Sequence, residues 1–184
     1  MDPELLPVLR ERWSPKGFDP AHTLDGHGLR VLLEAARWAP SAGNSQPWAF
    51  HLVRRNEPGW RDVVDRLAGS SRPWATEASL LVVNLAHVRV EGTDLEFSEF
   101  AHYDLGQAVA HMTIQAHGTG LACRQFRAFD REGLTELLQV PPHWQVMSMT
   151  AIGIPRSSVV REEGSAVRDA NITWPRAEGA EPVE

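Results

Sequence analysis

The chain has 184 residues, a length that suits one domain with its own hydrophobic core. Its formal net charge of −6 is spread along the chain, which argues against nucleic-acid binding, because that function needs a basic face or stripe. The single cysteine, Cys123, excludes an internal disulfide and a cysteine-rich zinc site. The N-terminus lacks the features of a signal peptide, and no apolar stretch is long enough to span a membrane. We therefore expect a cytoplasmic protein.

The sequence predicts helices mixed with short strands along the chain. Apolar residues recur at three- and four-residue steps over 27–38 and predict a helix, which Pro40 ends because the residue before a proline leaves the helical region. A continuous, β-branched apolar run over 79–86 predicts a strand covered on both faces. The other expected elements are helices over 4–12, 59–68, 99–118 and 130–139, the last capped by Asp130, and strands over 48–54, 121–126 and 145–154.

This order of elements predicts an α+β or α/β sandwich around a central sheet, as a single domain over residues 1–184. Residues from about 156 to 184 are polar and carry no core pattern of their own. We expect them to form an extended C-terminal tail that is either frayed or packed on another surface.

Arg12, Ser14 and Lys16 fall within five residues and directly follow a predicted helix. A guanidinium group offers a planar fork to a phosphate, an ammonium group a point charge and a hydroxyl a short donor. The segment therefore suits a phosphomonoester. A solvated basic turn is the competing interpretation.

Residues 39–50 form a loop of small residues between a predicted helix and a predicted strand. The loop carries two amide side chains, Asn44 and Gln46. It suits the close approach of backbone and amide groups to a flat ligand with polar edges. It also suits a plain connection in which the amides satisfy local backbone groups.

Both segments, in this order and at this interval, resemble the nitroreductase family. That family has an Arg-(Arg)-Ser-x-(Arg/Lys)-x-Phe motif followed by Ala-Pro-Ser-x-x-Asn-x-Gln-Pro-Trp. The likeness continues at residues 103–108, 118–121 and 152–155 and spans about residues 8–175. It implies a nitroreductase-like three-layer α/β/α sandwich with a central, mostly antiparallel sheet. It also implies a homodimer with two sites at its interface, with the C-terminal tail packed on the partner subunit.

The resemblance implies FMN as the cofactor and assigns its phosphate and ribityl chain to Arg12, Ser14 and Lys16, with backbone help from Trp13. The partner subunit would line the flavin with its own loop, through Pro40, Ser41, Ala42 and Asn44, supported by Gln46.

Further cofactor contacts are implied along the chain. Ser71 falls where many members carry an Asn that faces the pyrimidine edge of the flavin. The segment of residues 123–128 would direct a backbone N–H at flavin N5. The best candidates for the residue that donates it are Gln125, Phe126 and Arg127. Arg168 resembles a late arginine that reaches the phosphate, and Arg161 competes for that role.

The implied activity is FMN-dependent reduction of nitroaromatic, quinone or related small-molecule acceptors by NADH or NADPH in a ping-pong scheme. The cofactor carries the difficult step, so no catalytic side chain is assigned. A flavin-dependent oxidase or dehydrogenase of natural-product biosynthesis, and a flavin-binding protein without turnover, remain open. The histidines show no metal-binding spacing, and no metal is expected.

Overall fold

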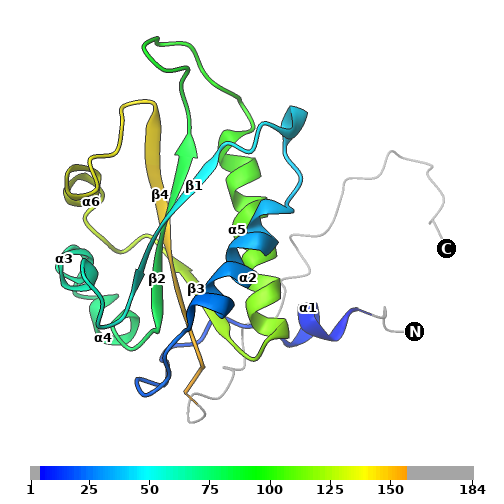
Figure 1. Cartoon of the computed structure of the whole chain (residues 1–184), viewed down its shortest axis with the longest axis vertical. Coiled ribbons are helices and arrows are strands. Elements are labelled where there is room, and N and C mark those ends of the chain that lie inside the picture. The colour runs from blue at the N-terminus through cyan, green and yellow to red at the C-terminus, as the bar shows by residue number, and fades with distance from the viewer. Residues whose placement is uncertain (1–4, 157–184) are drawn as a thin grey trace, which may run out of the picture.

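The computed structural model describes residues 5–156 (Figure 1). Four strands form one antiparallel sheet in the order β1-β2-β4-β3. In chain order the strands are β1 (Trp48–Arg54), β2 (Leu80–His87), β3 (Ala122–Phe126) and β4 (Trp144–Gly153). All four lie where the sequence predicts them, with bounds that differ by no more than one or two residues.

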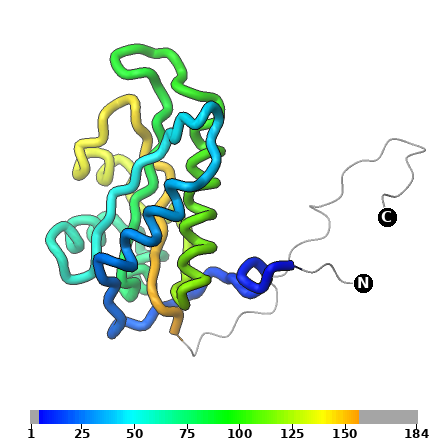
Figure 2. Tube along the Cα trace, turned by 45° about the vertical axis from the view of Figure 1, so that its right-hand side comes forward, coloured from blue at the N-terminus to red at the C-terminus, as the bar shows by residue number. Residues whose placement is uncertain are grey.

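Helices cover both faces of this sheet. The long helices α2 (Gly26–Arg37) and α5 (Ala101–Gly118) pack on one face, and the short helix α1 (Pro7–Glu11) lies against α5 (Figures 1 and 2). The other face carries three short helices, α3 (Trp60–Val64), α4 (Arg72–Ala75) and α6 (Arg131–Leu137). The predicted three-layer α/β/α sandwich with an antiparallel sheet is therefore confirmed. Within residues 5–156, none of the helices combines the length and apolar character that crossing a bilayer requires.

The helix predicted over 59–68 is shorter in the structure and ends at Val64. The N–H groups of Arg66 and Leu67 donate to carbonyls three residues back, and Leu67 then forms a bridge with Phe129. The chain leaves the helix because this bridge binds it to the segment before α6. Helix α6 begins as predicted, because the Asp130 carboxylate caps it by accepting from the Gly133 N–H at 2.9 Å.

Strand β2 lies at the centre of the core. Its side chains alternate between two buried clusters, because helices cover both faces of the sheet. Leu81 and Val83 pack toward α3, α4 and α6, whereas Leu80 and Val82 pack toward α2 and α5. The continuous apolar run in the sequence therefore reflects burial on both sides.

A bulge interrupts the pairing of β2 with β4. Asn84 pairs with Ser148, but the next residue, Leu85, pairs with Val146, which leaves Met147 as an extra residue in β4. A bulge of this kind shifts the alternation of side chains along the strand. As a result, Met147 and Ser148 both face α5, while Val146 joins the cluster on the opposite face.

A histidine is stacked between two aromatic rings just beyond the end of the sheet. The His87 ring lies 3.9 Å from the Phe97 ring centre and 4.7 Å from that of Trp144, and His143 approaches it at 5.3 Å. Its Nε2 atom is buried with no hydrogen-bond partner among the described residues. Burial lowers the pKa of His87 and the nearby His143 adds to this effect, whereas a backbone hydrogen bond with Arg89 and the charge of Glu91 oppose it.

We expect His87→Phe to reduce the loss of stability on acidification. The lowered pKa of His87 means that the unfolded chain binds more protons than the folded chain below the ordinary value of 6.5. The neutral ring therefore favours the folded state fully above that pH, and this contribution is lost as the pH falls. Phenylalanine keeps the stacked ring but cannot titrate. Urea unfolding of both proteins across this range checks the prediction, and parallel pH curves would contradict it.

Candidate active site

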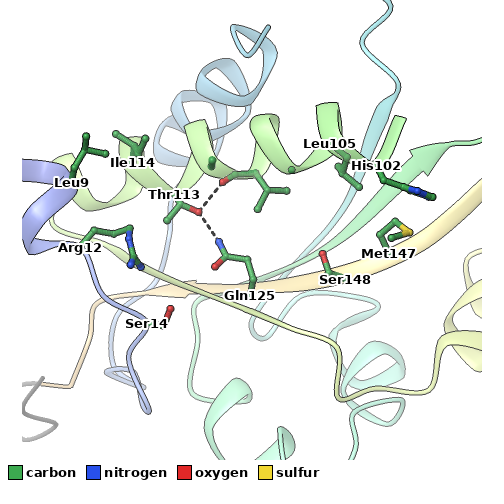
Figure 3. Close-up of a pocket in the computed structure, with 13 residues that line it drawn as sticks. Leu9, Arg12, Ser14, His102, Leu105, Thr113, Ile114, Gln125, Met147 and Ser148 are labelled. Carbon is green, nitrogen blue, oxygen red and sulfur yellow. Dashed lines mark hydrogen bonds between the residues drawn. The ribbon is translucent and has the colours of Figure 1, made fainter. Parts of the chain in front are cut away.

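A groove of about 700 Å³ runs along α5, on the side that faces β3 and β4 (Figure 3). Arg12 and Ser14 lie at one end of it, and Leu105, Met147 and His102 lie toward the other. Thr113 and Gln125 occupy the middle. Its size is typical of sites for small molecules and cofactors, and the mixture of an apolar wall with a few polar groups is also typical.

The segment that carries Arg12 and Ser14 is held in place by its neighbours. The Trp13 ring meets the His117 ring edge-on at 6.2 Å. The Pro15 carbonyl accepts from Arg124 Nη1 at 3.1 Å, and the Arg124 guanidinium lies 4.3 Å from the Trp74 ring centre. These contacts fix the cationic end of the groove before any ligand arrives. Trp13 Nε1 is buried and has no hydrogen-bond partner among the described residues.

Phe18 anchors the same segment in the core. Its side chain is fully buried, and its N–H donates to Glu77 Oε2 at 3.1 Å. Lys16, between these two fixed points, is exposed and does not line the groove. The structure thus brings Arg12 and Ser14 together and leaves Lys16 at the surface.

The loop of residues 40–46 lies outside the groove of its own chain, next to the start of α5. Asp104 in α5 is buried, and its Oδ2 accepts from the Ala42 N–H at 3.0 Å. Gln107 Nε2 donates to the Pro40 carbonyl at 3.3 Å and to Asp104 Oδ1 at 3.2 Å. The first turns of α5 therefore hold this loop against the helix.

Inside the loop the two amide residues adopt positive φ angles, 55° for Asn44 and 47° for Gln46. Gln46 Nε2 donates to Asn44 Oδ1 at 3.1 Å, and the Gln46 N–H donates to Ser41 Oγ at 3.0 Å. The two amide side chains thus bond each other, and the Ser41 hydroxyl, not an amide, accepts from a local backbone group. Ala42, Asn44 and Gln46 are nevertheless exposed at the surface.

Ser71 lies away from the groove. Its side chain is fully buried, and its hydroxyl donates to the carbonyls of Ala68 and Ala128. A hydroxyl has one proton, and these carbonyls engage it. The structure therefore does not bring Ser71 to Arg12 and Ser14.

Of the three consecutive candidates in and after β3, Gln125 alone lines the groove with its side chain. Phe126 points to the opposite face of the sheet, where its ring meets the Trp74 ring at 4.9 Å. The Arg127 guanidinium lies over the Phe129 ring, and Nη1 donates to the Phe129 carbonyl at 3.0 Å. Phe126 and Arg127 could therefore contact a ligand in this groove only through their backbone groups.

The other candidates are inert or lie outside the described residues. Burial raises the pKa of the Cys123 thiol to about 12, so this cysteine is not a nucleophile at neutral pH. In the described part of the chain, no group of three or more His, Cys, Asp or Glu side chains is arranged to hold a metal ion. Arg161, Arg168 and the C-terminal tail lie outside the described residues.

Sequence reasoning missed most of the groove lining, and three of the missed residues show why. Thr113 belongs to the buried side of α5, where its position predicts core packing, although a hydroxyl among apolar neighbours was an available signal. Met147 and Ser148 are neighbours in β4, and regular alternation would place them on opposite faces. Only the bulge brings both into the groove.

Comparisons with known proteins agree with this geometry. Residues 9–91 match the family model described as Nitroreductase family. The putative NADH dehydrogenase/NAD(P)H nitroreductase of Archaeoglobus fulgidus is 27% identical over 161 residues, which cover 83% of this chain and 86% of that protein. A 5,6-dimethylbenzimidazole synthase of Rhodobacter capsulatus is 25% identical over 174 residues, covering 82% and 83%. A crystal structure described as the oxidoreductase containing FMN superposes with a TM-score of 0.84 and 25% identity, covering 100% of this chain and 96% of that one.

Proposed function

We propose that the chain, whose residues 9–91 match the nitroreductase family model, is an FMN-dependent oxidoreductase of that family that transfers electrons from NADH or NADPH to a nitroaromatic, quinone or related small-molecule acceptor. The observation that carries the proposal is the groove along α5, which has a cationic end, a polar middle and an apolar end. Phosphate, polyol and flat ring follow one another in the same order in FMN.

The residues in the groove fit this cofactor. Arg12 and Ser14 offer a charged and a neutral donor for the phosphate. Gln125 offers a polar group in the middle, and Leu105 and Met147 provide apolar surface for the ring. When bound, FMN would supply the two-electron chemistry, and the protein would supply position and electrostatics.

In this proposal the residues of the chain bind the cofactor and orient it. Arg12 places a positive charge that fixes the phosphate end and so sets the register of the cofactor along α5. The apolar wall excludes water from the opposite end. A ping-pong scheme suits a single groove, because the electron donor leaves before the acceptor enters.

We also propose a cytoplasmic homodimer in which the loop of residues 40–46 lines the partner's groove. The loop is held by hydrogen bonds, is largely exposed and does not line its own groove. Large apolar side chains are also exposed at helix ends, with Leu6, just before α1, 66% exposed and Trp38, just after α2, 72% exposed. Apolar exposure of this extent is typical of interaction surfaces. Light scattering on the purified protein tests the dimer, and a monomer mass would contradict it.

The proposed function predicts that the purified protein is yellow and releases FMN on denaturation. Under anaerobic conditions, NADH or NADPH should bleach the flavin absorbance, and a quinone or nitroaromatic compound should restore it. A colourless protein that does not bind added FMN would contradict the whole proposal. A loaded protein that neither nicotinamide bleaches would contradict the reductase and favour a flavin-binding protein without turnover.

A second candidate function is a flavin-dependent oxidase or dehydrogenase of a biosynthetic reaction. The relative described as 5,6-dimethylbenzimidazole synthase favours it, because that name denotes a synthase and not a reductase. In this case nicotinamides should not bleach the flavin, whereas an organic donor should do so and oxygen should restore the colour.

A further inference from the structure

Thr113 lies in the C-terminal half of α5, where it lines the middle of the groove, and it is buried. Its Oγ1 is 2.7 Å from the Val109 carbonyl oxygen, one helical turn earlier. A carbonyl oxygen accepts but cannot donate, so this contact takes the single proton of the hydroxyl. The Thr113 oxygen is therefore an acceptor toward every other neighbour.

Gln125 uses this acceptor, and the Cys123 thiol also interacts with the Thr113 side chain. Gln125 Nε2 lies 2.6 Å from Thr113 Oγ1 (Figure 3). The opposite amide orientation would bring the Gln125 oxygen against an oxygen that has no proton left to donate. The contact therefore fixes the amide nitrogen toward α5, and the Gln125 Oε1 atom is directed away from Thr113.

This orientation makes the middle of the groove a hydrogen-bond acceptor. In Figure 3 the Gln125 oxygen points away from Thr113, toward the side of the view where Arg12 and Ser14 lie. An uncharged oxygen acceptor attracts hydroxyl groups and repels phosphate oxygens. Gln125 would thus mark the boundary between the phosphate end of the groove and the part that takes the polyol.

We infer that Thr113 is a positioning residue that fixes the Gln125 carboxamide, so that its Oε1 accepts a hydrogen bond from a ribityl hydroxyl of FMN. The inference rests on the proposed function, since it concerns the same groove and cofactor. Its benefit for binding is preorganisation. A glutamine side chain that is already held by Thr113 loses less conformational entropy when the cofactor binds.

The test compares FMN with lumiflavin, which has the same ring system but neither polyol nor phosphate. Thr113→Val removes the acceptor with little change of shape, and we expect it to weaken FMN binding about 5- to 10-fold, the effect of one hydrogen bond. Lumiflavin binding should be unchanged. Flavin fluorescence titration measures both affinities, and circular dichroism checks that the variant is folded.

Three further variants separate positioning from a general structural effect. Thr113→Ser keeps the hydroxyl and should retain wild-type affinity for FMN. Thr119→Val is the matched control, because the Thr119 hydroxyl also bonds helix carbonyls of α5 but lies outside the groove. In the Gln125→Leu background, Thr113→Val should weaken FMN binding no further, since Thr113 acts through Gln125.

Three results would overturn the inference. Thr113→Val could bind FMN as tightly as the wild type does, or it could weaken lumiflavin binding as much as FMN binding. The effects of Thr113→Val and Gln125→Leu on FMN affinity could also be additive. Failure of the proposed function looks different. In that case the wild-type protein itself does not bind FMN, whatever residue stands at position 113.

Discussion

Arg12→Ala is expected to weaken FMN binding by about 10- to 100-fold, the cost of losing a hydrogen bond from a charged group. Arg12 lines the end of the groove, and the neighbouring contacts of Trp13 and Pro15 hold this segment in place. The phosphate would therefore lose a donor that is already positioned. Fluorescence titration with FMN measures the loss, and riboflavin, which lacks the phosphate, should bind both proteins equally.

Arg61→Ala is the matched control for this change. Arg61 lies in α3, on the opposite face of the sheet, and its removal changes the net charge by the same amount. FMN affinity should stay at the wild-type level in this variant. If Arg12→Ala binds FMN as tightly as Arg61→Ala does, Arg12 has no place in the phosphate site.

Phe18→Ala is expected to lower the free energy of unfolding by about 3–5 kcal/mol. The Phe18 side chain is fully buried in the cluster that includes Leu81 and Val83. Its ring also packs against Gly153, where an added Cβ would lie 3.2 Å from Phe18 Cδ1. Truncation would leave a cavity between the sheet and the segment that carries the phosphate donors. Urea denaturation measures the loss.

Phe100→Ala serves as the control for the Phe18 variant. Phe100 is 46% exposed, so its truncation should cost less than about 1 kcal/mol. If both variants lose a similar free energy of unfolding, Phe18 is not an anchor of the core.

The sequence predicted the sheet and its long helices because their signals are local. A continuous apolar run identified β2, and apolar residues at three- and four-residue steps identified α2. Helix α4 was missed because four residues are too few to show a period. The leucines Leu5, Leu6 and Leu9, at and before the first helix, remain exposed in the single chain.

The candidate site was predictable in part, because the residue types of the cationic segment suit a phosphate. The structure brings Arg12 and Ser14 to one groove with the side chain of Gln125, of which only a backbone N–H was expected, and it leaves Lys16 at the surface. Ser71 was expected at the same site on the strength of its position in the chain, but sequence position does not reveal that its hydroxyl bonds two buried carbonyls. Tertiary partners of this kind decide whether a polar side chain is available to a ligand.

The bulge in β4 supplies the groove with a side chain that the pairing of the sheet does not need. A substitution of Met147 alters the groove wall and leaves the register of the sheet intact. A deletion of Met147 would leave Val146 next to Ser148 in regular alternation, with Val146 and Trp144 on the faces that they already occupy. The strand should therefore tolerate the loss of this one residue as well as its replacement, and the deletion would remove one apolar side chain from the groove.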